Sequence, residues 1–320
     1  MRVVHSREVE IMYNEERKEK FITNYTDSPK SAYYVRAVFK KFAQYEDNEW
    51  HDDLCMQSTE VLEPIINSQT GARMESAERA LIVLKEYVKW CARNGIETAD
   101  GVFGVRVDVV EAVKEQMVAS PLHLQKKLDI LFNTEDEQTM DCLYRAYIWM
   151  AYAGLTDVEA LEVEVSEVDL TDLVIRHNEK VYQLYKEARK TFEQACNLTG
   201  FKYKHKNYET INSRYPGTKL MRGIKSDVMK LSTLRSVITK KTAAHNMKLS
   251  YKKIFYSGIF YRVYENERAG ENISFADYVA DVLEKNDYVL NRNRTLNKIA
   301  NEMMRALEVD YDRWKCAFSI

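Results

Sequence analysis

The chain has 320 residues, 47 of them basic and 49 acidic, and 45% are hydrophobic. This composition excludes a disordered chain, and the length is typical of two domains. No apolar run is long enough for a signal peptide or a membrane span. The five cysteines are single and lack the spacing of a zinc site: Cys55, Cys91, Cys142, Cys196 and Cys316. We therefore expect a cytoplasmic protein without metal or cofactor.

The first third predicts a helical domain. Ser28 before Pro29 is a typical helix start, because the side chain can cap the helix and proline needs no N–H bond there. Arg36 and Lys40, with Lys41 beside them, lie on a face away from the apolar stripe. These three could contact a shared anionic partner, although basic residues are also ordinary on a solvated helix face.

Further helices are predicted along the chain. One opens at Ser76 and ends at Gly95, a second opens at Ser120–Pro121, and a third runs from about Glu137 to Ala153. We place a domain boundary near residue 118, which gives an N-terminal domain of residues 1–118 and a C-terminal domain of residues 119–320.

Three short β-prone segments follow the long helix. They lie at 163–168, 173–175 and 180–184, with a turn at His177-Asn178-Glu179 before the third. The spacing predicts a small antiparallel sheet beside the helices, and hence a mainly α protein.

A strongly basic stretch comes next, from Phe201 to Lys253. It holds 14 basic residues and two acidic ones, Glu209 and Asp227, whereas the rest of the chain has a net charge of −14. Clustered cations repel one another, and a polyanion relieves that repulsion. The stretch therefore predicts binding to nucleic acid, with a solvated basic surface as the alternative.

Several residues of this stretch are candidate DNA contacts. Lys202, Lys204 and Lys206 alternate, so an extended segment would place them on one side; a surface loop is the alternative. Four others flank a Pro216–Gly217 turn: Arg214, Lys219, Arg222 and Lys225. A helix is predicted to start at Ser226. Five more lie near a predicted helix start, where backbone N–H groups also favour anions: Lys240, Lys241, Lys248, Lys252 and Lys253. Most such contacts go to phosphates.

The order of elements resembles a known family. A helix ending in Ala153-Gly154-Leu155, then Glu159-Ala160-Leu161, then three short strands is similar to the catalytic domain of tyrosine recombinases, the phage integrases. The helix from Ser76 to Gly95 resembles part of their core-binding domain. The resemblance implies a tyrosine-recombinase-like fold that clamps double-stranded DNA.

The resemblance also assigns catalytic positions. In the family, a tyrosine attacks a DNA phosphate, while two arginines, a histidine or lysine, and a lysine at a strand turn stabilise the charge. The first arginine falls on Thr156, the second on Phe255, the histidine on Lys252 and the strand-turn lysine on Lys180. Tyr288 and Tyr311 both lie in the region of the nucleophile. A shift of a few residues would instead bring Arg145 or Arg262 into the site.

Neither threonine nor phenylalanine can replace a guanidinium on phosphate. Two missing arginines would lower the cleavage rate by on the order of 10⁴–10⁶ if their effects were additive. The sequence therefore predicts a protein that binds DNA and does not cut it, with a divergent active recombinase and an architectural DNA-bending protein as alternatives.

A subgroup of the family is more similar. Segments 144–154, 256–262 and 310–318 resemble the lysogeny repressors of SPbeta-like phages, which have the recombinase fold without recombinase activity. The resemblance implies a repressor that binds operator sites in a bacterial host, with a phage antirepressor as a further partner. Trp314 and Phe318, four residues apart, would dock a C-terminal tail, which in recombinases can pack on a neighbouring subunit and allow self-association.

Overall fold

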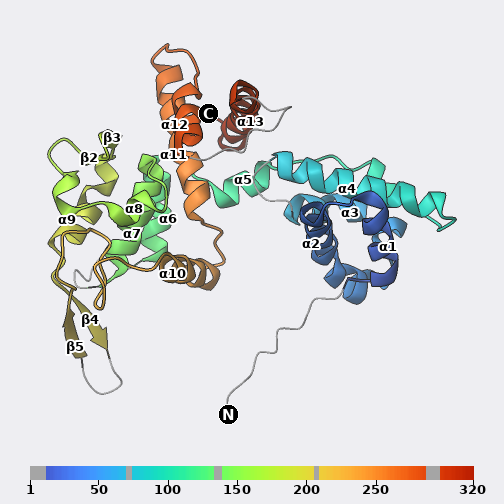
Figure 1. Cartoon of the computed structure of the whole chain (residues 1–320), viewed down its shortest axis with the longest axis horizontal. Helices are drawn as coiled ribbons and strands as arrows, with labels where there is room; N and C mark the ends of the chain where they lie inside the picture. The colour runs from blue at the N-terminus through green and yellow to red at the C-terminus, as the bar shows by residue number, and fades with distance from the viewer. Residues whose placement is uncertain (1–11, 70–73, 133–138, 205–208, 286–295) are drawn as a thin grey trace. The chain divides into compact units, whose positions relative to one another are not determined.

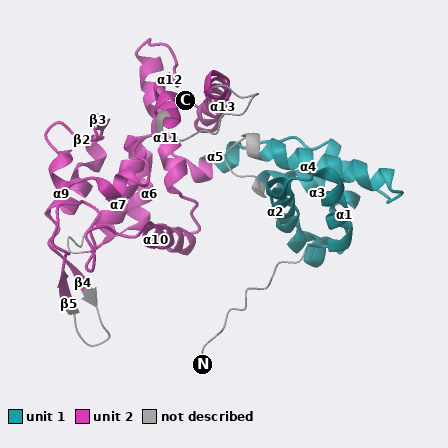
Figure 2. Ribbon diagram, viewed as in Figure 1, with its two compact units in different colours: residues 1–113 teal, residues 114–320 magenta. Residues whose placement is uncertain are grey.

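A computed structural model describes residues 12–69, 74–132, 139–204, 209–285 and 296–320 of the chain. The chain divides into two compact units, residues 1–113 and 114–320 (Figure 2). The boundary predicted near residue 118 lies in the segment between the helices α5 and α6. Each unit has its own hydrophobic core. Among the described residues, no helix is long and apolar enough to cross a membrane.

Unit 1 is helical throughout its described part. Its elements are α1 (Glu15–Tyr25), α2 (Pro29–Tyr45), α3 (Thr59–Gln69), α4 (Met74–Arg93) and the first residues of α5 (Val110–Gln116), with the short helices η1 (Glu46–Trp50), η2 (Leu54–Met56) and η3 (Gly101–Phe103) between them.

Local sequence accounts for the ends of two of these helices. The hydroxyl of Ser28 accepts a bond from the Ser31 N–H at the start of α2, as predicted. Gly95 follows the end of α4 with a φ of 70°, in the left-handed region that glycine adopts without strain. The helix predicted from Ser76 begins two residues earlier, at Met74.

Aromatic rings form the centre of the unit 1 core. Phe21, Phe39 and Tyr87 are buried and pack edge to face, with ring centroids 5.0 to 5.9 Å apart. They come from α1, α2 and α4, so the aromatic contacts hold these three helices together.

A fully buried ion pair lies in the same unit. The Lys18 ammonium donates to both carboxylate oxygens of Glu46, at 2.7 and 2.6 Å, and both side chains have 0% exposure. The Leu54 N–H also donates to Glu46, at 2.9 Å. Burial raises the pKa of Glu46 to about 7, although the neighbouring ammonium of Lys18 opposes that rise.

Unit 2 is mainly helical and carries the strands. Its helices are α6 (Pro121–Leu131), α7 (Asp141–Ala153), α8 (Glu159–Glu162), α9 (Arg189–Asn197), α10 (Leu231–Ala244), α11 (Tyr251–Arg268), α12 (Ala276–Lys285) and α13 (Leu296–Phe318), with the short helices η4 (Val165–Glu167) and η5 (Lys186–Ala188). Its strands are β1 (Val168–Asp169), β2 (Val174–His177), β3 (Lys180–Gln183), β4 (Gly200–Lys204) and β5 (Glu209–Ser213). The predicted fold class, mainly α with a small antiparallel sheet, is confirmed.

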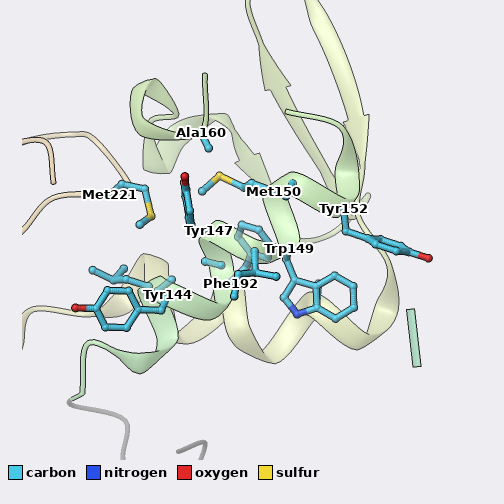
Figure 3. Packing of buried hydrophobic residues seen from close by; sticks show 14 of the residues in the cluster. Tyr144, Tyr147, Trp149, Met150, Tyr152, Ala160, Phe192 and Met221 are labelled. Atoms are coloured by element: carbon cyan, nitrogen blue, oxygen red, sulfur yellow. The ribbon is translucent and has the colours of Figure 1, made fainter. Parts of the chain in front are cut away.

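Helix α7 forms the centre of unit 2 (Figure 1). Every residue from Cys142 to Ala153 is buried, including Trp149 and Tyr152, whose rings pack edge to face (Figure 3). Helix α11 crosses α7 so closely at Gly258 that an added Cβ would lie 1.9 Å from the Tyr152 carbonyl oxygen. Gly154, with a φ of 106°, ends α7 at the predicted residue.

The first sheet has the order β1-β2-β3 and is antiparallel. The turn between β2 and β3 consists of Asn178 and Glu179, both with positive φ, which is the geometry of a two-residue hairpin loop. The second and third predicted strands are therefore confirmed. The first was too long: residues 165–167 form η4, and pairing begins only at Val168.

A second hairpin, β4–β5, was not predicted. It extends away from the helices of unit 2 (Figure 1), and its register pairs Lys202 with Ile211. The helix predicted to open at Ser226 is also corrected, because α10 begins at Leu231. The Ser226 hydroxyl donates to the Val228 carbonyl instead of capping a helix.

The C-terminal helix α13 packs on its own unit. Trp314 is fully buried, and its indole N–H donates to the Val118 carbonyl at 3.0 Å. Phe318 packs edge to face against His123 and Trp314. The predicted docking of this tail by Trp314 and Phe318 therefore occurs within unit 2.

Candidate nucleic-acid interface and the cavity beside it

The basic stretch follows the surface of unit 2 over several elements. It comprises the β4–β5 hairpin, the loop from Arg214 to Lys230, helix α10, and the first turn of α11. Its basic residues fall into two groups, those whose charge faces solvent and those whose donors are used inside the protein. Only the first group can contact a large anion without rearranging the fold.

The lysines of the hairpin begin on an extended strand. Lys202 and Lys204 lie two residues apart on β4, and the side chain of Lys204 lies outside the described residues. The Lys202 side chain is exposed. Lys206 lies outside the described residues.

Arg214 is buried, with 6% exposure, although we expected it to contact DNA. Its guanidinium donates to the carbonyls of Ala195, Leu198, Leu220 and Arg222, at 3.1 and 3.0 Å for the first two. Burial lowers the pKa of Arg214 to about 10, and the charge of Arg222 contributes. This corrects the expectation, because Arg214 joins α9 to the following loop and has no face open to DNA.

Two neighbours of Arg214 also have internal partners. Lys219 lies 3.2 Å from a Glu162 carboxylate oxygen and donates to the Glu162 carbonyl at 2.7 Å. Arg222 is half-buried and donates to the Lys219 carbonyl at 2.6 Å. Lys225, by contrast, is exposed on the same loop.

Helix α10 and the loop after it show the same division. Lys241 pairs with Asp141 at 2.9 Å and lies over the Phe132 ring, while Lys248 pairs with Glu115 at 2.7 Å. Lys240 is exposed on α10. Lys241 is half-buried in its pair, whereas Lys248, like Lys240, is exposed.

The start of α11 combines a cap with lysines. Ser250 accepts a bond from the Lys253 N–H, at 3.4 Å, and so caps the helix. Lys252 is exposed in the first turn, and Lys253 is half-buried. The predicted helix start near Lys252 and Lys253 is confirmed, and its N–H groups add to the positive potential there.

The candidates in unit 1 differ in their surroundings. Arg36 donates two hydrogen bonds of 2.6 Å to the carboxylate of Glu19, so its guanidinium already has an acidic partner. Lys40 is half-buried and Lys41 is exposed on the same helix. Lys41 is therefore the most accessible of these three.

Three of the positions that the resemblance assigned to catalysis meet at one cavity of unit 2. Thr156, Lys252 and Phe255 all line a cavity of about 500 Å³ between α7, α10, α11 and α12. Thr156 precedes Lys252 and Phe255 by about 100 residues in the sequence, and the fold brings them together.

None of these three residues supplies a guanidinium. Thr156 is engaged locally: its hydroxyl accepts from the Glu159 N–H at 3.3 Å, and the Glu159 carboxylate accepts from the Thr156 N–H at 2.8 Å. These reciprocal bonds fix the turn that precedes α8. Phe255 contributes only an apolar wall. Lys180 pairs with Asp281 on α12 and is not among the described residues that line the cavity.

An arginine that the sequence analysis missed does reach the cavity. Arg235 on α10 lines it and pairs with Asp157. Arg145 and Arg262 stay outside: Arg145 pairs with Asp129 at 2.9 Å, and Arg262 donates to the Tyr152 carbonyl at 2.8 Å.

Tyr311 lies away from the cavity, in the aromatic packing of α11 and α13. It is buried, its ring stacks on Trp314, and its hydroxyl donates to Glu267. Burial and the Glu267 carboxylate raise the pKa of Tyr311 well above the ordinary value, which disfavours a nucleophilic phenolate. Tyr288 lies outside the described residues. The tyrosines that line the cavity are Tyr147, Tyr251, Tyr256 and Tyr278.

Comparison with known families and structures adds to this geometry. Residues 12–93 match the family model described as "MrpR, N-terminal core-binding domain", which confirms the predicted core-binding domain for that segment. The integrase of mycobacterium phage Brujita is similar at 12% identity with a TM-score of 0.35, over 94% of this chain and 91% of that one.

Two structures of the Tn1549 transposon integrase in complex with circular intermediate DNA are similar at 11% identity with a TM-score of 0.34, over 91% of this chain and 98% of theirs. Comparison with curated proteins gives no match. The assignment of residues 12–93 therefore rests on the family model.

Proposed function

We propose that this chain is a sequence-specific double-stranded DNA-binding repressor of a temperate phage, with a recombinase-like fold and no strand-cleavage activity. The observation that carries the proposal is the composition of the cavity. Thr156 and Phe255 stand where the resemblance to tyrosine recombinases requires arginines, and both lie at the same cavity as Lys252.

The cavity is poorly suited to stabilise a phosphorane. One well-placed oxyanion donor contributes about 10²–10³ in rate, and neither the Thr156 hydroxyl nor the Phe255 ring can replace a guanidinium on phosphate. Arg235 is the one arginine among the described lining residues, and its guanidinium is paired with Asp157. A neutralised guanidinium stabilises transition-state charge less than an unpaired one.

DNA binding is supported by the exposed lysines of the basic stretch. We define the interface lysines as four exposed lysines of the basic stretch: Lys202, Lys225, Lys240 and Lys252. A run of ammonium groups on a strand, a loop and a helix start is suited to phosphates.

Repression, lysogeny and the partners of a repressor are supported by the resemblance to the lysogeny repressors alone. The proposal therefore includes operator sites near phage promoters and a phage antirepressor. Self-association through the tail would require α13 to leave its present packing, because Trp314 is fully buried within unit 2.

Cleavage is tested with a suicide substrate that carries the bound DNA site and a nick. The proposal predicts DNA binding without a covalent protein–DNA adduct on a denaturing gel. An adduct would support the alternative, a divergent active recombinase. Loss of that adduct in Tyr256→Phe or Tyr278→Phe would identify the nucleophile, since both tyrosines line the cavity.

Sequence specificity is tested by competition with random duplex. A repressor should keep its site against roughly a 10³-fold excess of competitor or more. Displacement by an equal amount of random duplex would indicate an architectural DNA-binding protein instead.

A further inference from the structure

Tyr147 carries a polar group that the fold leaves without a partner. Its side chain has 0% exposure, and its hydroxyl has no hydrogen-bond partner among the described residues. Tyr147 also lines the cavity of unit 2. Buried hydroxyls are nearly always bonded, so one without a protein partner at the wall of a cavity is available to a molecule in that cavity.

The rest of the cavity wall is mostly apolar or already satisfied. The Tyr251 ring lies 4.4 Å from the Tyr147 ring, centroid to centroid, but its hydroxyl donates to the Leu155 carbonyl at 2.8 Å. Ile238, Leu249 and Phe255 add apolar surface. A volume of about 500 Å³ with few polar groups suits a small organic molecule.

Two cations line the same cavity. Lys252 is exposed there, and Arg235 pairs with Asp157. The Asp157 charge and burial both raise the pKa of Tyr147 far above its ordinary value, with burial the larger cause, so its hydroxyl stays protonated and can donate. The cavity thus presents donors to a ligand, with one carboxylate as the exception.

We propose that this cavity binds a small amphipathic anion. The aromatic or hydrocarbon body of the ligand lies against Phe255 and Ile238, and its carboxylate or phosphate lies near Lys252. An acceptor atom of the ligand accepts a hydrogen bond from the Tyr147 hydroxyl. The proposal is independent of the proposed function, because it needs neither DNA nor catalysis. It differs from a bare phosphate site, since most of the lining surface is apolar.

Helix α7 provides a matched control for the Tyr147 hydroxyl. Tyr152 is also fully buried with an unbonded hydroxyl, but it does not line the cavity. Figure 3 shows the two hydroxyls pointing in different directions from the helix. Tyr147→Phe and Tyr152→Phe remove the same atom and break no bond that the structure contains.

The test is calorimetric titration of the full chain, without DNA, with 1-naphthyl phosphate, 2-naphthoate, neutral 2-naphthol and inorganic phosphate. We expect saturable binding of the two aromatic anions and much weaker binding of naphthol and of phosphate. Tyr147→Phe should lower the affinity for the aromatic anions by about tenfold, and Lys252→Met should lower it several-fold. Tyr152→Phe should leave this affinity unchanged.

Each other outcome overturns the proposal. Absence of saturable binding by either aromatic anion up to millimolar concentration would exclude the site. Equal binding by inorganic phosphate would show a simple anion site without an apolar subsite. Equal affinities of Tyr147→Phe and the wild type would show that the hydroxyl meets only water. A separate DNA titration in the presence of 2-naphthoate then shows whether the ligand and DNA compete at Lys252.

Discussion

At the scale of single residues, Arg214 and Lys252 show how differently two cations of one basic stretch are used. Arg214 donates to four backbone carbonyls and is buried, whereas Lys252 is exposed at a helix start. Counting charge in the sequence identifies the stretch but does not separate these roles. The carbonyl partners of Arg214 come from α9 and from the following loop, and no sequence pattern marks them.

Arg214→Met should destabilise unit 2. The substitution leaves several buried carbonyls without donors, and we expect it to lower the free energy of unfolding by about 3 kcal/mol. Urea denaturation followed by circular dichroism measures the change. Lys225→Met, on the exposed surface of the same loop, should change it by less than about 0.5 kcal/mol. Equal effects would contradict the structural role of Arg214.

Lys240→Ala and Lys252→Ala should weaken DNA binding and flatten its salt dependence. Each lost phosphate contact reduces the slope of log K against log salt by about 0.9. Binding titrations at several salt concentrations give the slopes, with Lys186→Ala as the control because Lys186 is exposed outside the basic stretch. Unchanged slopes in both variants would remove Lys240 and Lys252 from the interface.

The Lys18–Glu46 pair should be strongly coupled. Lys18→Met alone leaves a buried carboxylate without its cation and should cost about 3–5 kcal/mol. Adding Glu46→Gln should restore part of that loss, because the amide oxygen can still accept from the Leu54 N–H. Hydrogen exchange of the α2 and α4 amides reports on unit 1. A double variant whose loss equals the sum of the single losses would contradict the coupling.

At the scale of elements, the sequence predicts helix ends well where the cause is local. Ser28, Ser120 and Gly154 act at the ends of α2, α6 and α7 as expected, because a cap or a positive φ involves only neighbouring residues. The expected helix start at Ser226 was wrong, because that residue lies in a loop whose backbone bonds to distant residues, such as the Leu220 N–H to the Val163 carbonyl.

The strands show the same limit. The hairpin at Asn178 and Glu179 can be predicted from the sequence because its turn involves only neighbouring residues. The pairing of β4 with β5 was missed, since the lysines of β4 resemble a solvated loop as much as a strand. At the cavity, Thr156, Lys252 and Phe255 were placed by resemblance, whereas Arg235 and Tyr147 depend on how α7 and α10 pack.

Gly258→Ala should disrupt the packing of α11 on α7. The added methyl would lie 1.9 Å from the Tyr152 carbonyl oxygen, so the helices must separate, and we expect a loss of more than about 3 kcal/mol. Gly95→Ala is the comparison: its φ is 70° and the space around it is open, so only backbone strain of about 1 kcal/mol applies. Similar midpoints in a urea denaturation would contradict the close helix contact.

At the scale of the whole molecule, the charge is divided between the basic stretch and the rest of the chain. The stretch carries +12 and the remainder −14, so the protein as a whole is nearly neutral. An acidic remainder should oppose non-specific attachment to DNA and make the binding depend on the interface lysines. This division, together with the match of residues 12–93 to a family model of a core-binding domain, is the basis for proposing a specific DNA-binding protein.

The central claim is that the protein recognises particular DNA sites and leaves them intact. The most direct measurement is a pull-down of native prophage and host DNA by the protein, followed by sequencing of the bound fragments. The account predicts a few sharp sites that share a sequence and lie near phage promoters. A single site at an attachment junction, or a diffuse signal over the genome, would contradict it.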